Sequence, residues 1–99
     1  MNVVFAPQAL LRLEDQLRYL RERNEAASSR LRDRVFDFVD EHLARFPNSG
    51  HQINDKLWER WIPGTRLVLW YEIRDEDLLI MTIWHTAQDR GSQTAADED

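Results

Sequence analysis

Hydrophobic positions follow a helical spacing in the first half of the chain. Four leucines at intervals of three and four residues predict a helix over residues 7–23 with one apolar face: Leu10, Leu13, Leu17 and Leu20. Asn24 suits the N-cap of a second helix, whose apolar stripe comprises Leu31, Val35, Phe38, Val39, Leu43 and Phe46. Pro47 ends this pattern because proline cannot continue a helix. Since the two helices follow each other closely, we expect an antiparallel helical hairpin.

Strand-like segments lie on both sides of this hairpin. The β-branched segment 2–6 predicts a first strand, and residues 56–62, 66–73 and 78–84 predict three more, separated by turn signals at 63–65 and 74–77. Short turns between successive strands are typical of an antiparallel meander. The order β-α-α-β-β-β therefore predicts an α+β fold, a mainly antiparallel sheet that carries the helical hairpin on one face.

This pattern also predicts which side chains form the core. We expect one buried group drawn from both helices and two strands: Leu13, Leu17, Leu31, Val35, Phe38, Leu69 and Ile80. Trp70 lies mid-strand and is expected in the core as well. Trp58 and Trp61 have opposite parity on one strand, so one of them should face away from the helices. An exposed tryptophan of this kind is a common anchor for a binding partner.

Composition narrows the class of protein. Hydrophobic residues make up 42% of the 99 residues, which suits one globular domain. The net charge is −5, without the basic excess of a general nucleic-acid binder. Cysteine is absent and no apolar run is long enough to span a membrane, so we expect a cytoplasmic protein that does not bind membranes. Residues 91–99 are small, polar and acidic, and we expect a disordered tail there.

Two segments resemble a known family. "PQALLRLEDQLRYLRERN" (7–24) and "IPGTRLVLWYEIRDEDLLIMTIWHTAQDR" (62–90) are similar to the ParE/RelE superfamily of bacterial toxins, and more closely to its ParE-like branch. The resemblance covers roughly residues 3–90 and implies a single toxin domain over residues 1–90. It also implies a type II toxin-antitoxin module, in which a co-encoded antitoxin protein binds the toxin in a hetero-oligomer. ParE-like toxins act on DNA gyrase, whereas RelE-like toxins cut mRNA in the ribosome.

The resemblance to the RelE branch singles out two residues for catalysis. Metal-free RNA cleavage needs a general base, cations that stabilise the phosphate, and an acid for the leaving group. Arg66 is at the sheet position where the RelE branch often has an arginine, and His85 follows the last strand and can titrate near neutrality. Alternatively, Arg66 is a solvated or salt-bridged residue at a strand start, and His85 only hydrogen-bonds a nearby group. A terminal tyrosine and a lysine cluster are absent, which disfavours the nuclease.

The sequence therefore favours a toxin that works by binding. We expect a ParE-like inhibitor of DNA gyrase or a related topoisomerase that is not itself an enzyme. The residues expected to contact target or partner are Trp58, Trp61, Arg66, Trp84, His85, Asp89 and Arg90. No metal-ligand spacing and no cofactor motif are present. The alternatives are a RelE-like ribosome-dependent mRNA endoribonuclease, with the ribosome and mRNA as its partners, and a toxin-fold protein without activity that serves only as an antitoxin partner.

Overall fold

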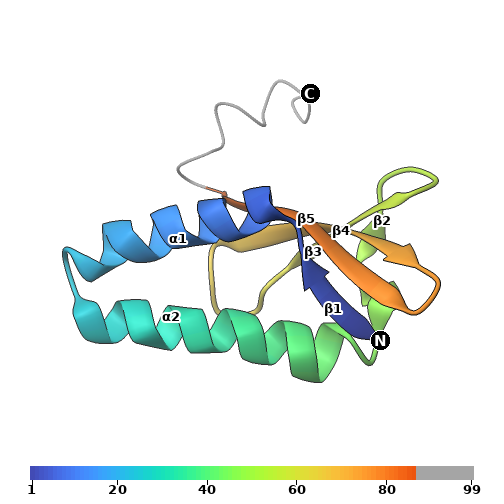
Figure 1. Cartoon of the computed structure of the whole chain (residues 1–99). Helices are drawn as coiled ribbons and strands as arrows, with labels where there is room; N and C mark the ends of the chain where they lie inside the picture. The colour runs from blue at the N-terminus through green and yellow to red at the C-terminus, as the bar shows by residue number, and fades with distance from the viewer. Residues whose placement is uncertain (87–99) are drawn as a thin grey trace.

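The computed structural model describes residues 1–86, and it confirms the predicted α+β class (Figure 1). The helices are α1 (Pro7–Arg21) and α2 (Glu25–Phe38), and α2 continues through one π-helical turn at Val39–Leu43. A short 3-10 turn follows at Pro47–Ser49. The strands are β1 (Asn2–Phe5), β2 (His51–Gln52), β3 (Leu57–Trp61), β4 (Leu67–Arg74) and β5 (Asp77–His85). Asp89, Arg90 and the expected tail at 91–99 lie outside the described residues.

The strands form one mixed sheet in the order β1-β5-β4-β3-β2. The predicted meander of β3, β4 and β5 is confirmed, because each of these strands pairs antiparallel with the next. β1 joins the outer side of β5 in parallel. β2 was not predicted, since it consists of only two exposed polar residues that pair with the middle of β3, and so short a segment leaves no period to detect.

The helical hairpin forms as predicted (Figure 1). The side chain of Asn24 accepts a hydrogen bond from the Ala27 N–H at 3.0 Å, which caps α2. The buried Ser28 hydroxyl donates to the Leu17 carbonyl oxygen at 2.9 Å and ties the two helices together. The buried row of α1 is Ala9, Leu13 and Leu17, so the prediction for Leu10 is wrong: this side chain is 41% exposed. The row begins at Ala9, whose small side chain gives a weaker hydrophobic signal than a leucine.

Side chains from both helices and the sheet form one core. Leu13, Leu17, Val35, Leu69 and Ile80 are buried in it as predicted. Leu31 and Phe38, which were also predicted to be buried, pack only partly against this core.

Phe46 departs from the predicted stripe of α2. The helix has ended before this residue, and the Phe46 N–H donates to the His42 carbonyl oxygen in the turn that follows. The Phe46 side chain is therefore 57% exposed.

The sheet has two unlike faces, because successive side chains of a strand point to opposite sides. On β4, Leu67, Leu69 and Tyr71 belong to the core beneath the helices, and we call this side the helix face. Val68 and Trp70 point to the other side, which we call the open face. The prediction that Trp70 lies in the core is therefore wrong: its side chain is half-buried on the open face. Both faces of β4 are apolar, so the sequence pattern could not tell them apart.

Candidate functional site: the open face of the sheet

Two lateral rows of side chains define the open face. Strand register aligns Trp61, Val68 and Trp84 in one row across β3, β4 and β5, and it aligns Glu59, Trp70 and Thr82 in the neighbouring row. Side chains aligned in this way across antiparallel strands lie beside one another on the same face. The open face thus gathers three of the four tryptophans of the chain.

The tryptophans of the open face differ in exposure. Trp61 is 60% exposed, whereas Val68 is fully buried and Trp84 is 8% exposed. The Trp70 and Trp84 rings meet edge to face with centroids 6.2 Å apart, an arrangement that favours ring packing. The Trp70 Nε1–H donates to a Glu59 carboxylate oxygen at 2.9 Å, which orients the Trp70 ring. Trp61 is therefore the most accessible tryptophan of the open face, whereas Trp70 and Trp84 pack against each other within it.

Trp58 lies on the other side of the same strand. It pairs with Tyr71 and stacks on the Tyr71 ring at 6.3 Å, on the helix face. The structure thus agrees with the prediction that one of Trp58 and Trp61 faces away from the helices. Trp58 packs against the core and does not share a surface with Trp61.

Arg66 and His85 meet at one corner of the sheet but on opposite faces. His85 pairs with Leu67, a core residue, so the pleat places His85 on the helix face. The Thr86 N–H donates to the Arg66 carbonyl oxygen at 2.9 Å, which continues the same register by one residue. Arg66 itself lies in a bend one residue before β4, so we assign it to the side of Val68 and the open face from the alternation of the strand that follows. A general base and a phosphate-binding cation must approach one reacting group together, and here the sheet separates them.

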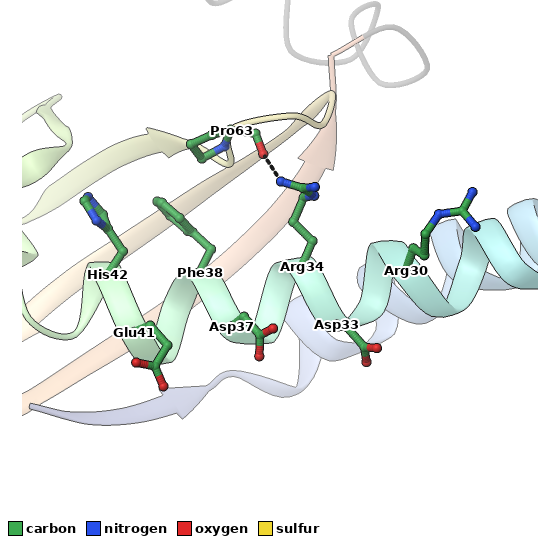
Figure 2. A pocket seen from close by; sticks show the side chains of 8 residues that line it. All are labelled: Arg30, Asp33, Arg34, Asp37, Phe38, Glu41, His42 and Pro63. Carbon is green, nitrogen blue, oxygen red and sulfur yellow. Dashed lines mark hydrogen bonds between the residues drawn. The ribbon is translucent and has the colours of Figure 1, made fainter.

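A groove runs along α2 on the helix face (Figure 2). It has a volume of about 520 Å³, and its walls are formed by Arg30, Arg34, Phe38, His42 and Pro63, together with carboxylates from α2. An Arg34 Nη donates to the Pro63 carbonyl oxygen at 3.3 Å, and His42 stacks on Phe38 at 5.1 Å. Side chains of both signs line this groove, a composition that suits charged peptide better than a polyanion.

Metal-binding clusters and membrane-spanning helices are both absent from the part of the chain that the structure describes. Within residues 1–86, no three His, Asp or Glu side chains gather closely enough to hold a metal ion. None of the helices in this range has the length and hydropathy required to cross a membrane.

Comparison with known proteins decides the family. A family model described as the ParE toxin of the type II toxin-antitoxin system, parDE, matches residues 3–90. The chain belongs to the ParE toxin family. Among solved structures, it is similar to a chain of the chromosomal ParDE toxin-antitoxin system from P. aeruginosa, with a TM-score of 0.73 and 10% identity over 86% of this chain and 95% of that chain.

A more distant structural match is to a YoeB dimer from Staphylococcus aureus. Here the TM-score is 0.46 and the identity 18%, over 86% of this chain and 97% of that chain. The match is too weak to support an argument about activity. A comparison with the sequences of curated proteins finds no match. The resemblance to the ParE-like branch is thus confirmed as family membership and as fold.

The ParE-family chain carries two features that the sequence patterns did not reveal. Arg60 lies between Trp58 and Trp61 in sequence, so alternation could have placed it on the helix face. Its guanidinium lies 5.0 Å above the Phe38 ring, and its Nε is buried without a hydrogen-bond partner. The second feature is the Trp70–Glu59 hydrogen bond, which depends on the register of β3 against β4 and has no signal in the sequence.

Proposed function

We propose that this ParE-family chain is the toxin of a type II toxin-antitoxin module that inhibits DNA gyrase or a related topoisomerase by binding it. A co-encoded antitoxin neutralises the toxin in a hetero-oligomeric complex. The observation that carries the proposal is the open face. Trp61 is exposed and shares a lateral row with the buried Val68 and Trp84, and an accessible tryptophan beside an apolar layer is a typical hot spot of a protein interface.

The arrangement of the ionisable residues supports binding over nuclease chemistry. A RelE-like endoribonuclease requires Arg66 and His85 to act on one phosphate and its neighbouring hydroxyl. The register of β5 against β4 puts His85 on the helix face, and the alternation of β4 assigns Arg66 to the open face, which favours binding over a shared catalytic role. The chain belongs to the family described as the ParE toxin of parDE, and the topoisomerase target is what the resemblance to ParE-like toxins implies.

The test compares two activities of the purified protein. One assay measures supercoiling by DNA gyrase, and the other measures mRNA cleavage on translating ribosomes. We expect inhibition of supercoiling without mRNA cleavage. Trp61→Ala should raise the concentration for half-inhibition about 30-fold, as expected for a hot spot worth about 2 kcal/mol. Ile53→Ala, which truncates another exposed apolar side chain, is the control and should leave inhibition unchanged.

Two further variants address the nuclease alternative. His85→Ala and Arg66→Ala should each remain toxic on induction in cells, because a binding surface does not depend on one ionisable group. Loss of a general base would instead lower a rate by about 10²–10⁴-fold. If either variant folds normally yet loses toxicity together with ribosomal mRNA cleavage, the chain is an endoribonuclease and the proposal is wrong.

A further inference from the structure

The open face carries a carboxylate whose charge is not neutralised. Alternation places Glu72 on this face, two residues after Trp70 on β4, and an Arg74 Nη lies 2.8 Å from one of its carboxylate oxygens. Glu59 on β3 instead accepts the Trp70 Nε1–H at 2.9 Å. Within residues 1–86, no basic side chain forms an ion pair with Glu59. An indole therefore orients the Glu59 carboxylate, and its negative charge remains available to a partner.

The surroundings of Glu59 strengthen its attraction for a cation. Its register partners are His51 on β2 and Trp70 on β4, so the side chain lies between two strands and is half-buried. In the described chain, His51 makes no ion pair with it. Apolar neighbours displace part of the water that screens a charge, and a cation gains more at such a carboxylate than at a fully solvated one.

Trp61 lies beside this carboxylate. It follows Glu59 by two residues on β3, so the two side chains share the open face and their backbones are about 7 Å apart along the strand. The Trp61 side chain is 60% exposed, and β2 pairs with Trp58 and Glu59 without reaching Trp61. The face of an indole ring attracts cations. Glu59 and Trp61 thus form two walls suited to one positively charged group.

We propose that Glu59 and Trp61 hold an arginine side chain of the target topoisomerase; the identity of this partner rests on the proposed function. The guanidinium stacks on the Trp61 ring and donates hydrogen bonds to the Glu59 carboxylate. Arginine suits the site better than lysine, because its planar fork matches two carboxylate oxygens and its flat face stacks on an aromatic ring. The Glu59 oxygen that accepts from Trp70 keeps a second lone pair, so both oxygens can take part.

The charges nearby fix where the arginine lies. Arg66, which alternation assigns to the open face, is two residues before Val68, and Val68 is the register partner of Trp61. Arg66 is therefore beyond the Trp61 row as seen from Glu59, and like charge keeps the incoming guanidinium on the Glu59 side of the ring. A phosphate group would meet the unneutralised Glu59 instead, so charge complementarity selects a basic group of a protein over nucleic acid.

The first experiment is an NMR titration with Nα-acetyl-arginine amide at low ionic strength. It follows the indole N–H signals of the four tryptophans, and Trp61→Phe assigns the Trp61 signal. The compound should shift this signal in a saturable way. Nα-acetyl-citrulline amide has the same shape without the charge and should bind at least about tenfold more weakly. The corresponding lysine compound should bind several-fold more weakly than the arginine compound.

A charge-removing variant tests the carboxylate. Glu59→Gln keeps an oxygen that accepts the Trp70 N–H, so the Trp70 indole proton should stay protected from exchange and the fold should be unchanged. Its affinity for Nα-acetyl-arginine amide should nevertheless fall about tenfold, because a charge-assisted hydrogen bond becomes a neutral one. Asp55→Asn removes the same charge from the exposed segment between β2 and β3 and should bind as the wild type does.

The second experiment asks whether the target uses this site. Glu59→Gln should raise the concentration for half-inhibition of gyrase supercoiling about tenfold, whereas Asp55→Asn should leave it unchanged. Added salt should weaken inhibition by the wild type more than inhibition by Glu59→Gln, since salt screens the attraction that the variant lacks.

Four results would overturn the inference. Equal binding of the arginine and citrulline compounds, or undiminished binding of the arginine compound by Glu59→Gln, would show that no cation site exists. Equal binding of the lysine compound would refute the choice of arginine. Equal inhibition of gyrase by Glu59→Gln and the wild type would show that the target does not use the site. A wild-type protein that leaves gyrase fully active would instead refute the proposed function, and the NMR titration would still decide whether Glu59 and Trp61 bind a guanidinium group.

Discussion

Tyr71→Phe removes one oxygen atom from a side chain that fastens the segment after α2 to the sheet. The Tyr71 ring is fully buried, and its hydroxyl donates to the Pro47 carbonyl oxygen at 2.7 Å. Gly50 packs so closely here that a Cβ atom would lie 2.5 Å from this hydroxyl and 2.5 Å from the Glu59 carbonyl oxygen. The variant keeps the ring and loses only the hydrogen bond.

The expected cost follows from the chemistry of that bond. A neutral hydrogen bond contributes about 1 kcal/mol net to the free energy of unfolding. For a domain of this size, 1 kcal/mol corresponds to a fall of roughly 4–8 °C in the melting temperature. Thermal unfolding at pH 7, followed by circular dichroism, measures this shift. Tyr19→Phe removes the same atom from a side chain that is 46% exposed and should melt as the wild type does.

The pH dependence gives a second signature of Tyr71. Burial raises the pKa of its phenol above the ordinary tyrosine value, although a Gly50 backbone hydrogen bond and the Arg60 charge act in the opposite direction. The native state therefore keeps this proton at a pH where the unfolded chain loses it. The resulting contribution to stability is complete below about pH 10 and is lost as the pH rises through the folded-state pKa.

The wild type should therefore lose stability more steeply than Tyr71→Phe above about pH 10, so that the difference between them narrows. Unfolding in urea at pH 7, 9 and 10.5 measures this change. A Tyr71→Phe protein that melts with the wild type at pH 7, and whose stability follows the wild type at every pH, would refute both the hydrogen bond and the buried phenol.

The other predictions separate surface from core. Trp61→Ala should lower the free energy of unfolding by less than about 1 kcal/mol. Trp58→Ala should lower it by about 2–3 kcal/mol, because the Trp58 ring stacks on Tyr71 and packs against the core. Urea unfolding of both variants measures the contrast, and equal losses would contradict the assignment of the two faces. Leu17→Asp should unfold the domain, since it places an unpaired carboxylate in a position that is 9% exposed; a preserved melting temperature would show that the buried face of α1 is wrongly assigned.

The sequence determined the elements and their order. Leu13 and Leu17, Asn24 and Pro47 carry the helical period, the cap and the stop, and these are local properties that need no tertiary information. The turns at 63–65 and 74–77 are too short for a crossover connection, so the strands on either side of each turn can pair only antiparallel, as they do. Residues 7–24 and 62–90 carry these local patterns and the resemblance to the family, and the family model matches residues 3–90.

The tertiary structure decided which side chains share a surface. Trp70 could be placed only by the register of β4 against its neighbours, because both faces of that strand are apolar. The separation of Arg66 from His85 arises in the same way: they lie 19 positions apart in the sequence, and only the pairing of Leu67 with His85 tells which face each one takes. A strand alternates with a period of two, so one residue of register reverses every assignment of face. Register is set by packing across the whole sheet, which no single segment encodes.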